Sequence, residues 1–575
     1  MTRPTRRASR VLAGLGVAVI AVALGLVAAA PAYAASFTVT NAADTGAGSL
    51  RQAIIGANGS PGSTIAIQAG LVIDMSTFAN QAVTASVVVT GDASNPPTII
   101  GPKQSAIFQV TGLTASIEVD NVTMQASTTV TSGDAITTAG GPGSVTLTND
   151  SFLNFPSPAV ELELQTGDLT ATHCTFSGNA ATAADSDGGA IIVGSVHNVT
   201  ITGSTFDHNH ADNNGGAIFL NAANRVNISG STFDQNSAGL SGGAIGITAW
   251  TGSSTWTGNT FTGNTAAAGA SHIGGAAFSV SHVPPGVTFI VDKSTFSGNT
   301  APAQSASTSG AVGYINDIGG TVQVTNSTMT GNHFTGVVPL KTGFGIDLAV
   351  GSTEATGEFD VVQSTFDESG PGKDLLSVNT NLGLVRIASS TLTGPGVLIV
   401  SNNPHASAGA VEVRDSIAIT TSSADAIDVA DAGAEISYSI TSSVAGPQLV
   451  DLGSTQFDVT DPQIGGLGNN GGPTQTRLPL TGSPAIDAGD PTFTVPLTDQ
   501  RGAGFPRITN GRVDIGAVEV AGTTATTPTL AATGVNPLPT AWTASTAFAT
   551  GALLLGAVLL TRRRRNTAQQ NTARR

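Results

Sequence analysis

Between residues 174 and 332 the chain repeats one pattern, in which a large apolar residue is followed three residues later by Asn. A second pattern, Gly-Gly-Ala followed by a small or aliphatic residue, alternates with the first. A repeat of 27 to 35 residues predicts stacked units that bury their apolar faces only against each other. The first pattern occurs at Phe176/Asn179, Phe206/Asn209, Phe233/Asn236, Phe261/Asn264, Phe296/Asn299 and Met329/Asn332, and the second at Gly188–Ile191, Gly215–Ile218, Gly242–Ile245 and Gly274–Ala277, with a weaker copy at Ser309–Val312.

Apolar residues also alternate shortly before each Phe, as at Val199 and Ile201. A period of two is typical of β-strands. A change of phase by one residue at Gly203, and again at Gly230, then turns the following Ser and Phe back toward the interior. Each unit is therefore predicted to contain three short strands, and about eleven or twelve such units would make a rod roughly 50 Å long.

These elements predict an all-β fold, a right-handed parallel β-helix over residues 61–450 with Phe stacks and Asn ladders inside. We expect a C-terminal cap domain over residues 451–520, followed by a short Thr-, Pro- and Ala-rich stalk over 521–529. Residues 530–575 are predicted to hold a transmembrane helix.

Residues 35–60 are predicted to close the N-terminal end of the rod. Phe37–Thr40 is expected to be a strand, and Ser49–Asn58 a short helix with one apolar face. Ser49 and Gln52 have the spacing of a capping box at the start of that helix. Such a helix would cover the exposed edge of the first coil.

The paired Gly-Gly-Ala-Ile and Phe-x-x-Asn patterns resemble the repeats of polymorphic membrane protein autotransporters and of other pectin-lyase-like β-helix surface proteins. Gly48–Ala53 is similar to the Cys-Ser-Leu-Arg-Glu-Ala motif that caps bacterial parallel β-helices, with Gly48 in place of Cys and Gln52 in place of Glu. The resemblance implies a fold and not a function, since lyases, hydrolases, adhesins and inert stalks all use it.

Residues 451–520 resemble the choice-of-anchor Q domain, which precedes varied surface-anchoring tails. The motifs that carry this resemblance are Asn469–Thr474, Gly482–Asp490, Thr498–Gly502 and Val513–Glu519. Five polar residues there form either an active constellation or, as we favour, a set of Asx turns and an Arg–carboxylate pair that hold a Gly-rich cap together. They are Asp487, Asp490, Asp499, Arg501 and Asp514.

The first residues carry four Arg, an apolar run and a small-x-small site, which together predict a secretory signal peptide over 1–34. Cleavage is expected between Ala34 and Ala35, and an uncleaved anchor is the alternative. The protein is therefore expected to be secreted.

The C-terminal end combines a pentapeptide, an apolar stretch over 541–560 and four consecutive Arg. The pentapeptide consists of Leu530, Ala531, Ala532, Thr533 and Gly534. This order resembles the cell-wall sorting signals of Gram-positive surface proteins, in the variant associated with class E sortases. The resemblance implies cleavage after Thr533, transfer to peptidoglycan and contact with the membrane only before sorting. A retained membrane tail is the alternative, and the internal Leu478–Gly482 copy lacks both a span and a basic tail.

Composition supports an extracellular solenoid. Between residues 35 and 533, 12 basic residues against 38 acidic ones give a formal charge of −26, which argues against nucleic acid and anionic membranes as partners. The single Cys174 excludes an intrachain disulfide. It stands where neighbouring units have Ser204 and Ser231, so a small buried side chain is expected rather than a nucleophile.

The best catalytic candidates are Asp207 and Asp234, one residue beyond the Phe on adjacent units, with His208 and His210 nearby. Outward carboxylates about 5 Å apart would suit a retaining glycosidase or a Ca²⁺ site. β-Helix lyases also need a Lys or Arg base, and Arg225 is the one cation near this place. The body has four Lys, at Lys103, Lys293, Lys341 and Lys373.

Four further residues precede the Gly-Gly corners and are candidate Ca²⁺ ligands, although turn formation explains them better. They are Asp185, Asp187, Asp212 and Asn214. We expect no cofactor and no catalysis.

The predicted function is a cell-wall-anchored surface protein that binds glycan or protein ligands, in the manner of an adhesin, through variable loops such as the one over 300–308. A secreted polysaccharide lyase or glycoside hydrolase is the first alternative, and a passive spacer is the second.

Overall fold

The computed structural model describes residues 34–520, apart from gaps at 79–80, 102–105, 129–131, 140, 142, 165, 184, 268–273, 303–308, 336–343, 353–356, 369–373, 381, 402–410, 430–432, 447–448 and 494–495. These residues all belong to the first of two compact units, Met1–Gly522. The predicted signal peptide, stalk, sorting motif, transmembrane span and most of the 300–308 loop lie outside the described residues. No helix within the described part is long and apolar enough to cross a membrane.

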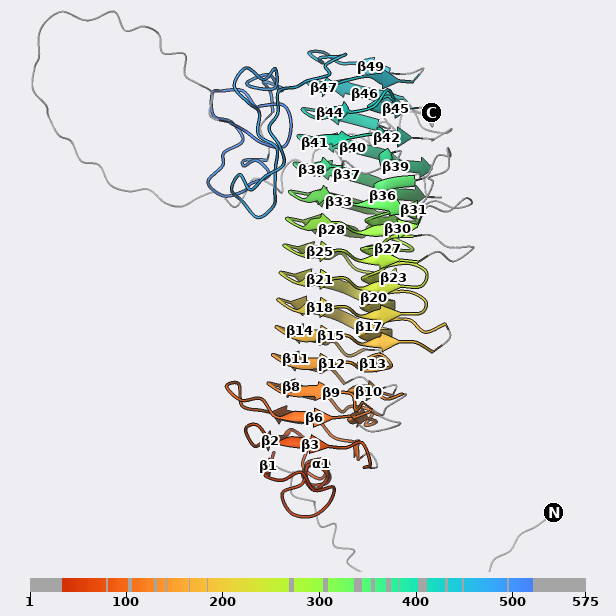
Figure 1. The fold of residues 1–575 in the computed structure, drawn as a ribbon, viewed down its shortest axis with the longest axis vertical. Coiled ribbons are helices and arrows are strands. Elements are labelled where there is room, and N and C mark those ends of the chain that lie inside the picture. Colours follow the sequence, from red (N-terminus) through yellow and green to blue (C-terminus); the bar gives the residue numbers. More distant parts are fainter. Residues whose placement is uncertain are drawn as a thin grey trace, which may run out of the picture. The chain divides into compact units, whose positions relative to one another are not determined.

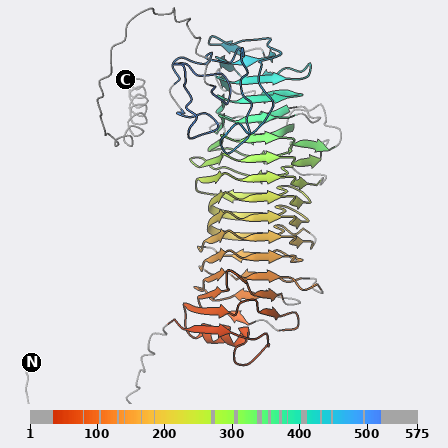
Figure 2. The same ribbon diagram turned by 60° about the vertical axis from the view of Figure 1, so that its left-hand side comes forward.

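Short parallel strands stack coil upon coil along one axis (Figures 1 and 2). Sheet A is the largest, with 29 strands in the described part of the chain, and it forms two neighbouring columns. The column that contains the Gly-Gly-Ala units consists of β4 (Ala82–Val83), β7 (Phe108–Val110), β10 (Ile136–Thr138), β13 (Val160–Glu163), β23 (Ile245–Trp250), β27 (Phe278–Val280), β31 (Ser309–Gly310), β32 (Gly313–Ile315), β36 (Phe344–Ser352), β39 (Asp374–Thr380), β42 (Val397–Ser401), β45 (Ile427–Val429) and β48 (Val444–Ala445).

The second column of sheet A contains the alternating apolar pairs that precede each Phe. It consists of β1 (Ser36–Val39), β2 (Ser63–Ile67), β5 (Val87–Thr90), β8 (Ile117–Asp120), β11 (Val145–Thr148), β14 (Leu169–Thr172), β24 (Ser254–Thr257), β28 (Thr288–Asp292), β33 (Thr321–Thr325), β37 (Glu358–Val362), β40 (Leu384–Ala388), β43 (Val411–Arg414), β46 (Ala434–Ser437) and β49 (Leu449–Asp451). Two long strands, β17 (Ile191–Thr202) and β20 (Ile218–Ser229), run through both columns.

Sheet B contains the Phe strands and sheet C the residues just after the Asn ladder. Sheet B consists of β3 (Val72–Asp74), β6 (Thr98–Ile100), β9 (Thr123–Gln125), β12 (Ser151–Leu153), β15 (Thr175–Ser177), β18 (Thr205–Asp207), β21 (Thr232–Asp234), β25 (Thr260–Thr262), β29 (Thr295–Ser297), β34 (Thr328–Thr330), β38 (Thr365–Asp367), β41 (Thr391–Gly394), β44 (Ile417–Thr420) and β47 (Ile440–Thr441). Sheet C consists of β16 (Ala180–Ala181), β19 (His210–Ala211), β22 (Ser237–Ala238), β26 (Thr265–Ala266), β30 (Thr300–Pro302) and β35 (His333–Thr335).

The three strands predicted for each unit are confirmed, and sheet B has 14 strands in the described part of the chain, more than the eleven or twelve units expected. β3 and β6 form two additional rungs of sheet B, with Ile73 and Ile99 paired in the position that Phe fills later. The predicted change of phase is a single left-handed residue, with φ of 58° at Gly203 and 57° at Gly230. The first coils have aliphatic residues where later coils have Phe. The number of units predicted from the aromatic pattern is therefore too low.

Three ladders hold the interior together. Stacked Phe rings follow one another at centroid distances of 4.6 to 4.8 Å from Phe152 to Phe296. The buried Asn side chains hydrogen-bond to each other from coil to coil, as in Asn209 Nδ2 to Asn236 Oδ1 at 2.9 Å. At the turn between sheets A and B, the Ser204 backbone N–H donates to the Ser231 hydroxyl at 3.2 Å. The ladders satisfy polar groups that stacking would otherwise leave buried and unpaired.

The Gly-Gly corners need glycine for two different reasons. Gly215 has a φ of 67°, a left-handed conformation that other residues adopt at a cost. A Cβ on Gly216 would collide with the carbonyl oxygens of Gly243 and Ser237 in the next coil. The pair therefore allows the chain to turn while the coils remain one strand spacing apart.

The predicted capping helix is α1 (Leu50–Asn58), and it buries Leu50, Ala53, Ile54 and Ala57 against the first coil. The Ser49 hydroxyl accepts a hydrogen bond from the Gln52 backbone N–H at 3.3 Å. The Ser49 N–H donates to the Gly46 carbonyl at 3.2 Å and not to Gln52. Only the first half of the capping box thus forms.

Residues 461–520, here called the flank segment, lie along the outer face of sheet B, beside the last coils (Figure 1). The Thr474 hydroxyl donates to the Asn326 carbonyl at 2.9 Å, and the Ala517 N–H donates to the Thr391 hydroxyl at 3.0 Å. Buried apolar contacts join Ile417 to Ile515. Because these partners belong to coils well before the last one, the contacts are lateral and do not place residues 461–520 over the end of the rod as a cap.

Asp150 occupies the ladder position that Ser fills in most later coils. Its carboxylate accepts hydrogen bonds from the Val122 and Thr148 backbone N–H groups, at 2.9 and 3.1 Å, and is 1% exposed. Burial raises the pKa of this carboxyl to about 7. The folded state therefore holds a proton that the unfolded state releases near pH 4, so this contribution to stability is present below pH 4 and is lost as pH rises toward 7.

We expect Asp150→Ser to raise the melting temperature at pH 8 but not at pH 4, because a Ser hydroxyl accepts the same backbone bond without a buried charge. Thermal unfolding at both pH values measures the difference. Glu118→Ser, at an exposed position of the neighbouring strand β8, is the matched control. An equal gain at both pH values would show that the Asp150 charge is not the cause.

Candidate functional site

The structure brings the predicted pair Asp207 and Asp234 together. Both end strands of sheet B, and they are direct register partners on β18 and β21. The strands alternate, so the intervening Phe side chains are buried while the carboxylates face outward. The Ser177 hydroxyl on the preceding coil donates to Asp207 Oδ2 at 3.2 Å.

The predicted histidines do not complete a catalytic arrangement. His208 Nδ1 lies 2.5 Å from Asp207 Oδ1, and its side chain is 56% exposed. His210 turns away into sheet C, where its Nδ1 lies 2.8 Å from the Ser237 hydroxyl. Arg225 donates through Nε to the Ser253 carbonyl at 3.0 Å. Among the described residues, neither carboxylate forms an ion pair with Lys or Arg, so no strong base is held beside them.

The candidate Ca²⁺ ligands serve as turn-forming residues. Asp187 Oδ1 accepts hydrogen bonds from the Asn213 side chain at 2.8 Å and from the Asn214 backbone N–H at 2.9 Å. Asp212 Oδ1 lies 3.2 Å from His210 Nε2. These bonds tie each Gly-Gly corner to the next and do not form a cage of carboxylates.

One group of three carboxylates in the flank segment does have ligand atoms within 4.8 Å of one another, namely those of Asp487, Asp514 and Glu519. Backbone N–H groups already bind two of them. Asp514 Oδ1 accepts from Asp487 at 2.7 Å, and Glu519 Oε2 accepts from Asp514 at 2.8 Å. Burial raises the pKa of Glu519 to about 7, which agrees with a structural role.

The remaining polar residues predicted in this segment also hold it together. Asp499 Oδ1 accepts from the Arg501 N–H at 2.9 Å, and Arg501 forms an ion pair with Asp499 at 2.6 Å. Asp490 Oδ1 accepts from the Thr492 N–H at 2.7 Å. The expected Asx turns and Arg–carboxylate pair are therefore present.

Cys174 is buried, as expected, and its backbone N–H donates to the Ser204 hydroxyl at 3.1 Å. Burial raises the pKa of the thiol to about 12. A thiol with so high a pKa carries almost no thiolate at neutral pH, so Cys174 is a packing residue of the ladder.

A charged row on the second column of sheet A was not predicted from the sequence. Asp360, Arg386 and Glu412 are consecutive register partners on β37, β40 and β43. Arg386 contacts Asp360 at 3.2 Å through Nη1 and Glu412 at 3.3 Å through Nε. The sequence does contain a pattern that indicates this row. Arg386 lies between Val385 and Ile387, whose side chains face inward, so its own side chain must point outward.

Arg386 and Glu412 of this row line a cleft of about 500 Å³, which is large enough for a small ligand. The opposite wall comes from the flank segment and includes Phe493 and Pro496. Arg386 and Arg414 are each partly exposed there, with 37% and 44% of the side chain accessible. Both guanidinium groups are already paired with carboxylates, since Arg414 binds Asp490.

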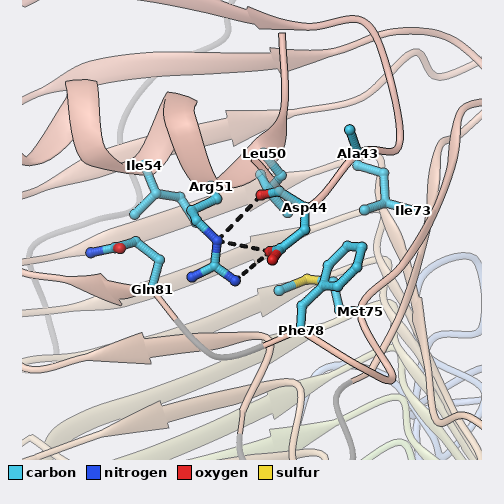
Figure 3. A pocket seen from close by; sticks show the side chains of 9 residues that line it. All are labelled: Ala43, Asp44, Leu50, Arg51, Ile54, Ile73, Met75, Phe78 and Gln81. Carbon is cyan, nitrogen blue, oxygen red and sulfur yellow. Dashed lines mark hydrogen bonds and ion pairs between the residues drawn. The ribbon is translucent and has the colours of Figure 1, made fainter. Parts of the chain in front are cut away.

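A smaller hollow lies beneath α1, between the capping helix and β3 (Figure 3). Its volume of about 10 Å³ has room for one water molecule at most. Arg51 points from the helix toward Asp44 and contacts its carboxylate through Nε at 2.8 Å. The Arg of the capping motif therefore fixes the helix to the preceding loop, and the hollow is structural.

A family model described as a right-handed beta helix region matches residues 107–279 and 164–366 of the chain. Curated proteins gave no match. Among solved structures, pectate lyase Pel9A is similar over 85% of this chain and 96% of its own, with 12% identity and a TM-score of 0.29. A mannuronic acid specific polysaccharide family 6 lyase from human gut microbiota is similar over 74% and 82%, with 10% identity and a TM-score of 0.27. Likenesses this distant carry no functional argument. The stacked parallel strands and the family match together establish that this chain folds as a right-handed parallel β-helix.

Proposed function

We propose that this protein is a non-catalytic extracellular β-helix that binds glycan chains along sheet B. The observation that carries the proposal is one outward row of hydroxyl and carboxylate side chains, here called the polar row. Its members are register partners on six consecutive strands: Ser177, Asp207, Asp234, Thr262, Ser297 and Thr330. Neighbouring members are one strand spacing of about 4.8 Å apart, which is close to the length of one pyranose residue.

The chemistry of the polar row supports binding more than bond cleavage. Hydroxyls donate hydrogen bonds to sugar hydroxyls and accept them, and ionised carboxylates accept them. Lyase chemistry would need a cation to neutralise a substrate carboxylate and a base to remove a proton. The polar row pairs with neither Lys nor Arg in the described part of the chain.

Replacing both Asp207 and Asp234 by Asn should weaken retention on immobilised cell-wall polysaccharides by about fivefold or more, because charge-assisted hydrogen bonds are lost. Affinity electrophoresis of the secreted chain would measure this. Thr200→Val, on the outer face of sheet A, is the matched control and should leave retention unchanged. Equal retention of the double variant and the wild type would show that the polar row is not part of the binding site.

A polysaccharide lyase is the second candidate, and one observation favours it. Arg386 stands between two carboxylates in a cleft beside an aromatic ring, which are the residue types that a uronate lyase uses. Against this, Arg386 is held by both Asp360 and Glu412, and a paired guanidinium is a poor base. We therefore rank binding first.

We further propose that the flank segment is a domain of the choice-of-anchor Q type and that the chain is a wall-anchored protein of a Gram-positive bacterium. The class E-like sorting motif Leu530–Gly534 and the apolar run over 541–560 support this. Attachment to peptidoglycan would hold the rod at the cell surface with its glycan-binding face accessible.

Thr533→Ala should leave the protein extractable by detergent, because Thr533 would no longer be available as the acyl donor. The wild type should be released only by a peptidoglycan hydrolase. Cell fractionation and immunoblotting compare the two, and Thr481→Ala in the internal motif is the matched control. Wall linkage that survives Thr533→Ala would refute the sorting assignment.

A further inference from the structure

A second cleft, of about 550 Å³, lies at the opposite edge of sheet B from the Arg386 cleft. β34, β38 and β41 supply Thr330, Asp367 and Thr393 on one side, and the flank segment supplies Arg477 on the other. Thr330 pairs with Asp367, and Asp367 with Thr393, in register. The polar row therefore runs directly into this cleft.

Two charged groups at the cleft are held in place. Asp367 Oδ1 accepts hydrogen bonds from Arg477 Nη2 at 2.7 Å and from the Thr393 hydroxyl at 2.6 Å. Arg477 Nη1 also donates to the Gly465 carbonyl at 3.0 Å. The side chains are thus pre-organised, which lowers the entropy lost when a ligand binds.

Two polar groups at the same place have no partner among the described residues. Arg477 Nε is buried and forms no hydrogen bond. The Thr330 hydroxyl, which lines the cleft, also makes no side-chain hydrogen bond with described residues. Arg477 Nε has no surface that a ligand could reach, so the Thr330 hydroxyl is the free group that could donate to or accept from a ligand oxygen.

Ile419, Pro462 and Ile464 add an apolar part to a lining that also contains the polar Glu368, Thr421 and Asp461. A pyranose ring has the complementary character, since its hydroxyls lie around the edge and its C–H groups form two apolar faces. From this match we propose that the cleft binds one residue of a neutral saccharide whose chain continues along the polar row. This inference rests on the proposed glycan-binding function and adds a site and a ligand class to it.

The charges of the cleft select against acidic sugars. Asp367, Glu368 and Asp461 line it, against Arg477 alone. A carboxylated sugar would meet this negative excess and lose affinity through like-charge repulsion. Neutral hexoses should therefore bind better than uronates.

The experiment is isothermal titration of the secreted chain with cellohexaose, mannohexaose and galactohexaose, and with hexagalacturonate as the acidic probe. At least one neutral hexasaccharide should bind more tightly than the uronate. Thr330→Val should weaken that binding by about fivefold, because it removes one hydrogen bond from a hydroxyl that the fold does not use. Thr200→Val is the control and should have no effect.

The outcomes separate this inference from the function on which it rests. Neutral binding that Thr330→Val weakens more than Thr262→Val, which changes a polar-row hydroxyl outside the cleft, supports the cleft. Neutral binding that Thr330→Val leaves unchanged overturns the cleft, and the Asp207/Asp234 double variant then decides separately whether the polar row binds glycan. Preference for hexagalacturonate overturns the ligand class, and no binding of any saccharide, with retention on wall polysaccharides also absent, overturns both proposals.

Discussion

Replacing Phe233 by Ala is expected to lower the free energy of unfolding of its coil by about 3 to 5 kcal/mol. Phe233 is 0% exposed, and its ring stacks between those of Phe206 and Phe261 at 4.8 and 4.7 Å. The stack is continuous, so the coils above and below cannot close the cavity without breaking their own backbone pairing. For this reason, the loss in free energy of unfolding should be close to the upper end of this range.

The damage should also be local, because each coil contacts mainly its two neighbours. Limited proteolysis followed by mass spectrometry should locate new cleavage sites within one coil of residue 233. Phe219→Ala is the matched control, since Phe219 points outward from β20 and is only half buried. Wild-type resistance to protease in the Phe233 variant would contradict the observed strand phase.

Gln500→Ala is expected to release the flank segment at a cost of about 2 to 4 kcal/mol, since several buried polar groups would lose their partner at once. Gln500 is 0% exposed. Its Nε2 donates to the Ser327 carbonyl at 3.2 Å and to the Thr328 hydroxyl at 3.0 Å, and its Oε1 accepts from the Thr365 hydroxyl at 2.6 Å. One side chain thus joins the flank segment to two coils.

Hydrogen exchange should detect this release as faster exchange over residues 461–517, while the rod up to β29 keeps its protection. Gln475→Ala is the matched control, because Gln475 is exposed and contributes only its backbone carbonyl. Unchanged exchange in the Gln500 variant would show that apolar contacts, such as those of Ile417 with Ile515, hold the segment alone.

The rod could be predicted because every physical cause of it is local or repeats at a fixed spacing. Phe, Asn and Gly-Gly recur in the central coils, and these coils bury them in the same way. The same logic identified α1, whose apolar stripe and Ser49 cap belong to ten consecutive residues. The register of Asp207 with Asp234 followed from the repeat alone.

The lateral position of the flank segment could not be predicted in this way, because its contacts span more than 100 residues, as from Ala517 to Thr391. One signal was available. In β44 both outward residues, Ile417 and Ile419, are apolar and buried, whereas strands β15 to β41 of sheet B present Thr, Ser and Asp. An apolar outer face predicts a covering segment but not which one.

Both clefts depend on that segment, so neither was accessible to sequence reasoning. Phe493 and Arg477 become lining residues only once the flank segment is docked. The charged row on sheet A was different. Asp360, Arg386 and Glu412 each lie between two inward apolar residues, and the repeat already aligned them. This row could therefore have been predicted from the sequence.

The central claim is that the surface of the rod binds glycans without cleaving them. The most direct measurement is mass spectrometry of neutral hexasaccharides, hexagalacturonate and alginate oligomers after incubation with the secreted chain, with and without Ca²⁺. The account predicts that bound oligosaccharides are recovered intact. Unsaturated or shortened products that disappear in Arg386→Gln or Asp234→Asn would contradict it and identify the protein as a lyase or hydrolase.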